Sequence, residues 1–303
     1  MISIPEGNRR TDMTHAQDNR IAFVNGEFTP LSAASIPVMD RGFLFGDGVY
    51  EVTAVIERRF ADDDAHLTRL DRSLREIDIP NPYSASVWTE IERDLARRNG
   101  LENGLIYIQV TRGVAERNFQ YPTGLAPTIV MFPQFKRVQD NPIIETGAKV
   151  VTLPDQRWSR CDIKSTSLLA QVLTKQAAQQ AGANEAWMVR DGSITEGASS
   201  TAFIVTKEGQ IVTRRLSSAV LPGVTRRTIM KIAHGMRLDL VERNITPDEV
   251  LTASEAFYTS ASTIAVPVVA FDGQTVGEGH PGPVFQTLYK TYLETIMAQT
   301  PEY

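Results

Sequence analysis

The 303-residue sequence contains few of the residues that build disulfides and metal sites. Its single cysteine, Cys161, excludes an internal disulfide and favours a reducing, cytoplasmic setting. The four histidines lie far apart in the sequence and show no metal-ligand spacing, so we expect no metal site. Since free cysteines are mostly buried and inert, we expect Cys161 to be a small packed side chain and not a nucleophile.

Long apolar runs and an excess of one charge are also absent. No run approaches the ~20 apolar residues that a membrane helix needs, and the N-terminus lacks the apolar core of a secretory signal. Lys and Arg number 31 against 36 Asp and Glu, which gives a formal charge of −5 and a pI of about 5.5. Because both signs are mixed along the chain, we expect no nucleic-acid partner. Since no apolar run is long enough, we also expect no membrane partner.

The glycine-rich signatures of nucleotide-binding folds are missing as well. No G-x-G-x-x-G leads from a predicted strand into a helix, and no G-x-x-x-x-G-K-[ST] is present. The predicted strands, hairpins and helices interleave without a regular βαβ alternation, which argues against a doubly wound sheet. The chain is long enough for one large or two ordinary domains, each with a sizeable core.

The residue pattern predicts two domains joined by a polar segment. Residues 1–20 are polar and predict a flexible N-terminal arm. Residues 21–133 combine β-rich runs with two amphipathic helical stretches and predict a small α+β domain. Residues 134–142 (QFKRVQDNP) carry a proline among polar residues and predict the interdomain linker. Residues 143–303 then form the larger domain.

Local signals predict the helices and several turns. Apolar residues at spacings of three and four predict helices at 66–77, 87–95, 168–177, 225–234 and 285–297. Thr246 with Glu249 predicts a capping box at the start of a further short helix. Three glycines between positions 42 and 48 predict a loop with special backbone angles. The acidic run Asp62-Asp63-Asp64 is expected to be a solvated turn.

Two side chains stand where chemistry is possible. Lys164 lies between a predicted strand and a predicted helix, where burial would disfavour the ammonium form and free the amine as a nucleophile or base. Taken alone, a solvated surface lysine is the commoner case. Glu196 ends a predicted strand ahead of small polar residues, where it could enter a pocket and hold a ring nitrogen protonated. Taken alone, a turn carboxylate is the commoner case here too.

Three further segments offer anion-binding groups. The turn at Pro222-Gly223 opens a helix whose first amides, at Val224 and Thr225, are unpaired and suit a phosphate. The loop at 258–263 adds hydroxyl and amide donors. Arg69 flanks an apolar helical stripe, from which it could clamp an anion bidentately. Each of these signals is weak by itself, and only their combination is informative.

Read in order, these segments resemble the fold-type IV family of pyridoxal-phosphate enzymes over about residues 21–298. The motifs are DRGFLFGDGVYE at 40–51, HLTRL at 66–70, SRCDIKS at 159–165, TEGASSTAF at 195–203, LPGVTR at 221–226 and TSAST at 259–263. The resemblance implies a two-domain α+β or α/β fold, with a small α+β domain and a larger pseudo-barrel domain. Within the family the sequence is most similar to D-amino-acid transaminases, through QVTRG at 109–113 followed by Arg117 and Tyr121-Pro122.

The resemblance also implies roles for the site residues. Lys164 would hold pyridoxal phosphate (PLP) as a Schiff base and carry the proton between substrate and cofactor. Glu196 would pair with the pyridine nitrogen. Tyr50 and Arg117 would bind the substrate α-carboxylate, with Arg117 reaching in from the neighbouring subunit, which implies a homodimer with sites at the interface. The phosphate would be held by groups from three segments: Arg69, Val224, Thr225, Ser260 and Ala261.

The implied reaction is a ping-pong transamination between D-amino acids, such as D-alanine and D-glutamate, and 2-oxo acids, such as 2-oxoglutarate and pyruvate. One position departs from the pattern. D-specific relatives usually carry a histidine two residues after the arginine, and here that residue is Phe119, whose ring donates no hydrogen bond to a carboxylate. An (R)-amine transaminase, an L-branched-chain aminotransferase and an aminodeoxychorismate lyase therefore stay open as alternatives. A non-enzymatic binding protein is disfavoured by the presence of both Lys164 and Glu196.

Overall fold

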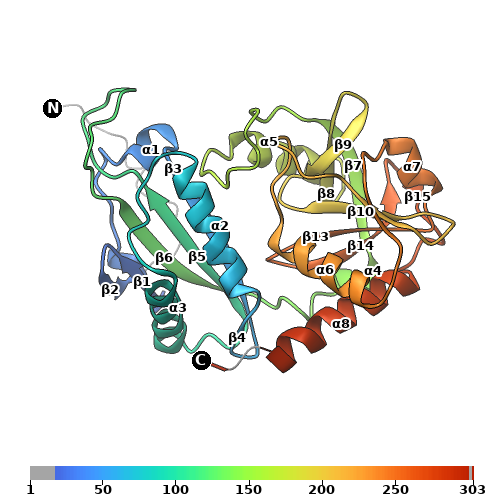
Figure 1. The fold of residues 1–303 in the computed structure, drawn as a ribbon, viewed down its shortest axis with the longest axis horizontal. Coiled ribbons are helices and arrows are strands. Elements are labelled where there is room, and N and C mark those ends of the chain that lie inside the picture. The colour runs from blue at the N-terminus through green and yellow to red at the C-terminus, as the bar shows by residue number, and fades with distance from the viewer. Residues whose placement is uncertain (1–17, 300–301) are drawn as a thin grey trace, which may run out of the picture.

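A computed structural model describes residues 18–299 and 302–303, which form two β-sheets with helices packed on them (Figure 1). The arm expected at residues 1–20 lies outside the described residues as far as position 17. From Arg20 onward the chain is tied to the fold, since the Arg20 guanidinium donates a 3.1 Å hydrogen bond to the Pro133 carbonyl.

The first sheet has six antiparallel strands in the order β2-β1-β6-β5-β3-β4. Side chains alternate between its two faces, so Ile106 and Ile108 point to the core while Tyr107 points to the opposite face. The strands are β1 (Ile21–Val24), β2 (Glu27–Pro30), β3 (Gly48–Ile56), β4 (Arg59–Phe60), β5 (Gly104–Thr111) and β6 (Thr128–Phe135).

Two helices cover the core face of this sheet, as their apolar stripes predict. They are α2 (Asp63–Arg75) and α3 (Ala85–Asn99), and they bury Leu70, Leu74 and Leu95 against the sheet. α3 ends at Gly100, whose φ of 57° is a left-handed conformation that favours glycine. The opposite face of the sheet is thereby left free to line a cavity.

The expectations for the glycine-rich segment before β3 and the acidic run after β4 are confirmed only in part. Gly46 has the expected special backbone angle, with a left-handed φ of 67°. The glycine-rich segment contains a short helix, α1 (Arg41–Phe45), because the Asp40 carboxylate caps it by accepting from the Gly42 amide at 2.8 Å. The acidic run contains the expected turn, at Asp62, and Asp64 is exposed, but Asp62 and Asp63 are half-buried and the run is not fully solvated. Asp63 begins α2, and Asp62 accepts hydrogen bonds from side chains distant in the sequence. A 3₁₀ helix, η3 (Leu31–Ala33), precedes α1.

The second sheet is mixed and has nine strands, in the order β12-β11-β10-β13-β14-β7-β8-β9 with β15 on β14. The pairs β11–β12, β14–β7 and β7–β8 are parallel, and the other pairs are antiparallel. The strands are β7 (Ala148–Pro154), β8 (Glu185–Arg190), β9 (Ser193–Gly197), β10 (Thr201–Val205), β11 (Ile211–Thr213), β12 (Leu240–Glu242), β13 (Glu255–Ser260), β14 (Ile264–Phe271) and β15 (Gln274–Thr275).

Five helices accompany this sheet within the described residues: α4 (Ile143–Thr146), α5 (Leu169–Gln180), α6 (Val224–Gly235), α7 (Pro247–Thr252) and α8 (Pro283–Gln299). The capping box predicted from Thr246 and Glu249 is present at the start of α7. No helix in the described part of the chain is long and apolar enough to cross a bilayer.

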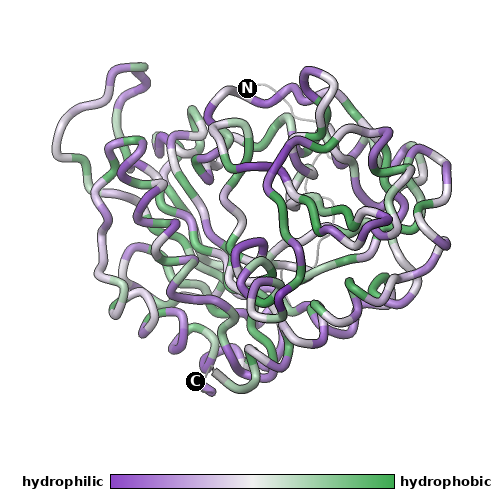
Figure 2. Tube along the Cα trace, turned by 45° about the vertical axis from the view of Figure 1, so that its right-hand side comes forward, coloured by the Kyte–Doolittle hydropathy of each residue, from purple (hydrophilic) through white to green (hydrophobic). Residues whose placement is uncertain are grey.

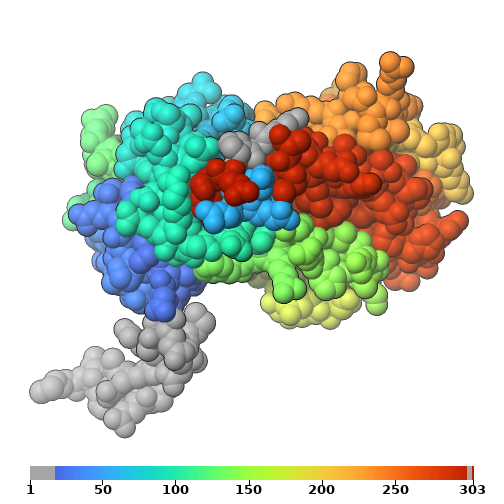
Figure 3. Space-filling view, turned by 90° about the horizontal axis from the view of Figure 1, so that it is seen from below, coloured from blue at the N-terminus to red at the C-terminus, as the bar shows by residue number. Residues whose placement is uncertain are grey.

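The two sheets use separate stretches of the chain, and hydrophobic residues follow the strands of both (Figure 2). We propose that residues 21–133 and 143–303 form two domains. β6 runs through Phe135, two residues into the expected linker, so the connection proper spans 136–142. The chain end returns to the first sheet, where the Tyr303 amide donates to the Arg58 carbonyl and its ring lies 5.6 Å from Phe60 (Figure 3).

Candidate active site

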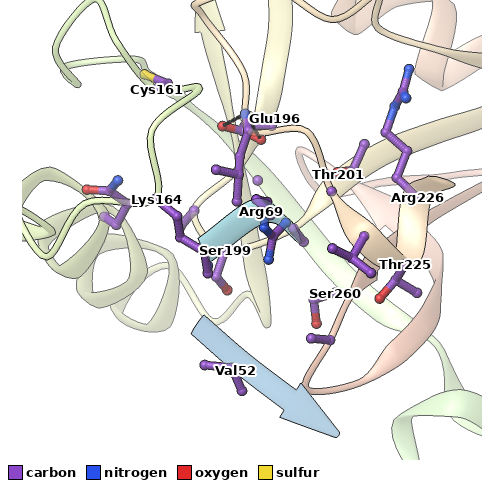
Figure 4. Close-up of a pocket in the computed structure, with 18 of the residues that line it drawn as sticks. Val52, Arg69, Cys161, Lys164, Glu196, Ser199, Thr201, Thr225, Arg226 and Ser260 are labelled. Atoms are coloured by element: carbon purple, nitrogen blue, oxygen red, sulfur yellow. Dashed lines mark hydrogen bonds between the residues drawn. The ribbon is translucent and has the colours of Figure 1, made fainter. Parts of the chain in front are cut away.

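A cavity of about 810 Å³, including its open mouth, lies where the two sheets meet (Figure 4). It brings together most of the predicted site residues: Tyr50, Arg69, Lys164, Glu196, Val224, Thr225, Ser260 and Ala261. Arg117 is not among them. It is exposed on the loop between β5 and β6, with its guanidinium 5.4 Å from the Phe45 ring.

Lys164 is positioned by strand-like pairing across the domain junction. β4 pairs only with the far end of β3 and leaves the edge near Gly48 without a strand partner. The segment around Lys164 pairs with that edge instead. The Tyr50 amide donates to the Lys164 carbonyl at 3.0 Å, and the Thr166 amide donates to the Gly48 carbonyl at 3.0 Å. The Lys164 Nζ then lies 4.0 Å from the centroid of the Tyr50 ring, within the range of a cation–π contact.

Glu196 lies near the end of β9 with 5% of its surface exposed. Both carboxylate oxygens accept from the Leu221 amide at 3.1 Å, and one also accepts from Arg157. Burial raises the pKa of Glu196, while the charge and hydrogen bond of Arg157 limit that rise. Arg157 in turn forms an ion pair with Asp155 at 2.8 Å. Sequence reasoning missed Arg157, which lies in a polar run with no periodicity.

Arg69 is held by a buried carboxylate that sequence reasoning also left without a role. Glu51 is fully buried and accepts from Arg69 Nε at 2.7 Å, from Arg69 Nη2 at 2.8 Å and from His66 Nδ1 at 2.8 Å. Burial alone would raise the pKa of Glu51, but Arg69 and His66 hold that pKa well below its usual range. Glu51 and His66 belong to the motifs at 40–51 and 66–70, and this membership was the only sign in the sequence that they contribute to the site.

The N-terminus of α6 and Arg69 together form a cup of hydrogen-bond donors, which is a candidate anion site. Gly223 occupies the cap position, and no side chain caps the first amides, those of Val224 and Thr225. Among the described residues, the hydroxyl of Thr259 is buried in this cavity without a hydrogen-bond partner. A Cβ on Gly223 would come within 2.9 Å of the Thr201 hydroxyl, so a larger residue would crowd the cup. These unsatisfied donors fit a phosphate.

Cys161 is buried, as expected, and its thiol donates to the Trp158 carbonyl at 3.1 Å. Burial raises the pKa of the Cys161 thiol to about 11, which disfavours the nucleophilic thiolate. Within residues 18–299 and 302–303, no three His, Cys, Asp or Glu side chains gather in a way that could hold a metal ion.

Residues 48–271 match the family model described as amino-transferase class IV. The chain belongs to the class IV aminotransferases. This aminotransferase is 38% identical to the D-alanine aminotransferase of Bacillus licheniformis over 278 residues, which cover 91% of this chain and 97% of the relative. It is 39% identical to the D-alanine aminotransferase of Staphylococcus aureus strain MSSA476, with 90% and 98% of the two chains covered.

Solved structures of the same fold are more distant in sequence. The branched-chain amino acid aminotransferase of Escherichia coli superposes with a TM-score of 0.84 at 23% identity and covers 94% of this chain and 96% of its own. The T.th. enzyme of the same name, solved with pyridoxamine 5′-phosphate, gives a TM-score of 0.84 at 24% identity, with 94% and 96% of the two chains covered. The predicted fold-type IV architecture is therefore confirmed, and the cofactor of this family is PLP.

Replacing Glu51 by Gln tests the support of Arg69. The variant leaves a buried guanidinium without its counter-ion, so the free energy of unfolding in urea should fall by about 3 kcal/mol. The low pKa keeps Glu51 ionised in the fold, so its contribution is fully present above about pH 4.5, its unfolded value, and is lost progressively as pH falls from there through the lower folded value. Between about pH 5 and pH 8 the difference in unfolding free energy between the wild type and the variant should therefore stay constant.

The exposed Glu57 provides a matched control, since Glu57→Gln should change the unfolding free energy by no more than about 0.5 kcal/mol. If Glu51→Gln also changes it by less than about 1 kcal/mol, the ion pair between Glu51 and Arg69 does not support Arg69.

Proposed function

We propose that this class IV aminotransferase acts on D-amino acids, with 2-oxo acids such as 2-oxoglutarate and pyruvate as acceptors. The observation that carries the proposal is the 38–39% identity to D-alanine aminotransferases along nearly the whole length of both chains. The branched-chain enzymes share the fold at about 23% identity, which supports no substrate assignment. We further propose that the enzyme is a cytoplasmic homodimer.

Different residues of the cavity would hold different parts of PLP. The cup of Arg69 and the first amides of α6 would bind the phosphate, with Ser260 and Ala261 closing its side. Glu196 would face the pyridine nitrogen, and Lys164 would attach the cofactor covalently. When bound, PLP supplies the carbonyl carbon that takes over the amino group and a ring that withdraws electrons from the substrate.

The protein's own contribution is charge and proton control. Burial raises the pKa of Glu196 and Arg157 limits that rise, so Arg157 favours the carboxylate form that would face the ring nitrogen. Lys164, when free, is the amine within the cavity that would remove the proton from the substrate Cα. Tyr50 stacks 5.6 Å from Tyr107, which fixes its ring beside Lys164, and it would bind the substrate carboxylate.

Arg117 would complete the carboxylate site from a second subunit. Within its own chain it lies outside the cavity, yet the neighbouring loop residues are held in place. Arg41 donates to the Asn118 carbonyl at 2.6 Å, and Arg112 stacks 3.7 Å from the Tyr121 ring. The loop lies along the same edge of the molecule as α1 and α5 (Figure 1). This edge carries exposed apolar side chains, as an interface between subunits would: Phe43, Phe119, Leu169, Val172 and Leu173.

Phe119 gives a second candidate function specific support. Its ring is 81% exposed and lies 5.6 Å from Phe45, so the loop that carries Arg117 presents an apolar surface. Such a surface suits an (R)-amine that lacks a carboxylate.

A donor panel with 2-oxoglutarate as acceptor separates the two functions. Because Arg117 would grip a carboxylate bidentately, we expect kcat/KM for D-alanine to exceed that for (R)-1-phenylethylamine and L-leucine by roughly 100-fold. D-glutamate would regenerate 2-oxoglutarate, so it is assayed with pyruvate as acceptor, and we expect the same preference for it over the amine and L-leucine. Equal or better turnover of the amine would replace the D-amino-acid assignment by an amine transaminase. Preference for L-leucine would indicate a branched-chain enzyme, and pyruvate release from aminodeoxychorismate would indicate a lyase.

Subunit complementation tests whether Arg117 acts across an interface. Lys164→Ala and Arg117→Ala should each lose most activity toward D-alanine. Mixed before assembly in equal amounts, they should regain roughly a quarter of wild-type activity, because each mixed dimer has one intact site. Glu116→Gln, on the same exposed loop, is the control and should remain active alone. No recovery on mixing would place Arg117 and Lys164 in the same chain's site or exclude Arg117 from it.

A further inference from the structure

Asp62 departs from what its position predicts. It occupies the cap position of α2, where an aspartate ordinarily accepts a hydrogen bond from its own helix, yet its side chain makes no such bond. Its φ of 55° is left-handed, a conformation that is costly for a residue other than glycine. A residue that forgoes its local hydrogen bond and adopts a strained backbone is stabilised by contacts made elsewhere.

Those contacts lie in the other domain. One Asp62 oxygen accepts from the Thr228 hydroxyl of α6 at 2.7 Å, and the other accepts from the Tyr292 hydroxyl of α8 at 2.8 Å. Tyr292 is only 2% exposed, and its hydroxyl also interacts with that of Thr225. A single carboxylate at the start of α2 thus fastens α2 to both α6 and α8.

These bonds flank the proposed phosphate cup. Asp62 and Arg69 are seven residues apart, so they lie about two turns apart on one face of α2. Arg69 Nη1 donates to the Pro222 carbonyl at 3.0 Å, just before α6, and Asp62 accepts from Thr228, just inside it. The start of α6 is therefore held against α2 at two points. Figure 4 shows Arg69 and Thr225 facing the same cavity from these two helices.

We propose that Asp62, Thr228 and Tyr292 form a positioning cluster that sets the distance between the Arg69 guanidinium and the first amides of α6, and thereby the affinity for the phosphate of PLP. The inference rests on the proposed phosphate role of Arg69 and α6. The two halves of the cup belong to different sheets, so the cup forms only when α2 and α6 are in register. The three residues themselves lie behind the cup, so they act through Arg69 and the α6 amides.

The test compares PLP with pyridoxal, which lacks the phosphate, in titrations of the cofactor-free full chain. Tyr292→Phe keeps the buried ring and removes only the hydroxyl. We expect it to raise the Kd for PLP roughly tenfold, because a hydrogen bond to a charged group is lost. The Kd for pyridoxal should stay within about twofold, because pyridoxal has no group to place in the cup.

Tyr289→Phe is the matched control. Tyr289 lies on the same helix and donates to the Gln139 carbonyl at 2.9 Å, away from α6, so both Kd values should stay within about twofold. Thr228→Val removes the other bond to Asp62 and should repeat the selective loss of PLP affinity, which keeps the test decisive should Tyr292→Phe not fold.

Arg69→Gln separates the two levels of the proposal. If Arg69→Gln weakens PLP more than pyridoxal while Tyr292→Phe and Thr228→Val do not, the positioning cluster is refuted and the phosphate site stands. If Arg69→Gln weakens both ligands equally, the phosphate site itself is wrong, and the cluster falls with it. Equal weakening of both ligands by Tyr292→Phe would mean that its hydroxyl serves general stability only.

Discussion

The buried ion pair between Glu51 and Arg69 is the interaction on which the junction between the two sheets depends. It neutralises and orients the guanidinium of Arg69, which then still has a donor for the Pro222 carbonyl at the entrance to α6. A buried guanidinium without such a partner would destabilise the fold. A guanidinium that instead turned out to solvent could not face an anion in the cavity. One ion pair inside the small domain thus fixes a functional group that serves the large domain.

The same junction places the amine of Lys164, which we propose to be the reactive one. Lys164 belongs to the second domain in sequence, but its backbone completes the free edge of β3 in the first. Glu196 reaches the cavity from β9, and Arg157 balances its charge there. The Lys164 amine, the Glu196 carboxylate and the candidate anion cup therefore come from different elements. Their relative positions depend on the contact between the two sheets. The returning Tyr303 and the Asp62 bonds reinforce that contact.

Sequence patterns located the amphipathic helices, the capping box at Thr246 and the motifs that carry Lys164 and Arg69. They could not reveal partners that are distant in the chain. Arg157 and Glu196 are 39 residues apart, and Asp62 and Tyr292 are 230 apart, so no periodicity links either pair. The prediction of a solvated turn at 62–64 missed the role of Asp62. Three adjacent carboxylates usually face water, as Asp64 does, whereas tertiary hydrogen bonds hold Asp62. The helix α1 was missed because its cap and its left-handed end lie among glycines.

Borohydride reduction of the PLP-loaded enzyme, followed by peptide mass spectrometry, tests the site at the junction most directly. Reduction makes the covalent bond between cofactor and lysine permanent, so the modified residue can be read from the peptide. The account predicts a phosphopyridoxyl group on the peptide that contains Lys164 and on no other. A modified Lys149 or Lys175, or an enzyme that is fully active yet carries no modification, would contradict it.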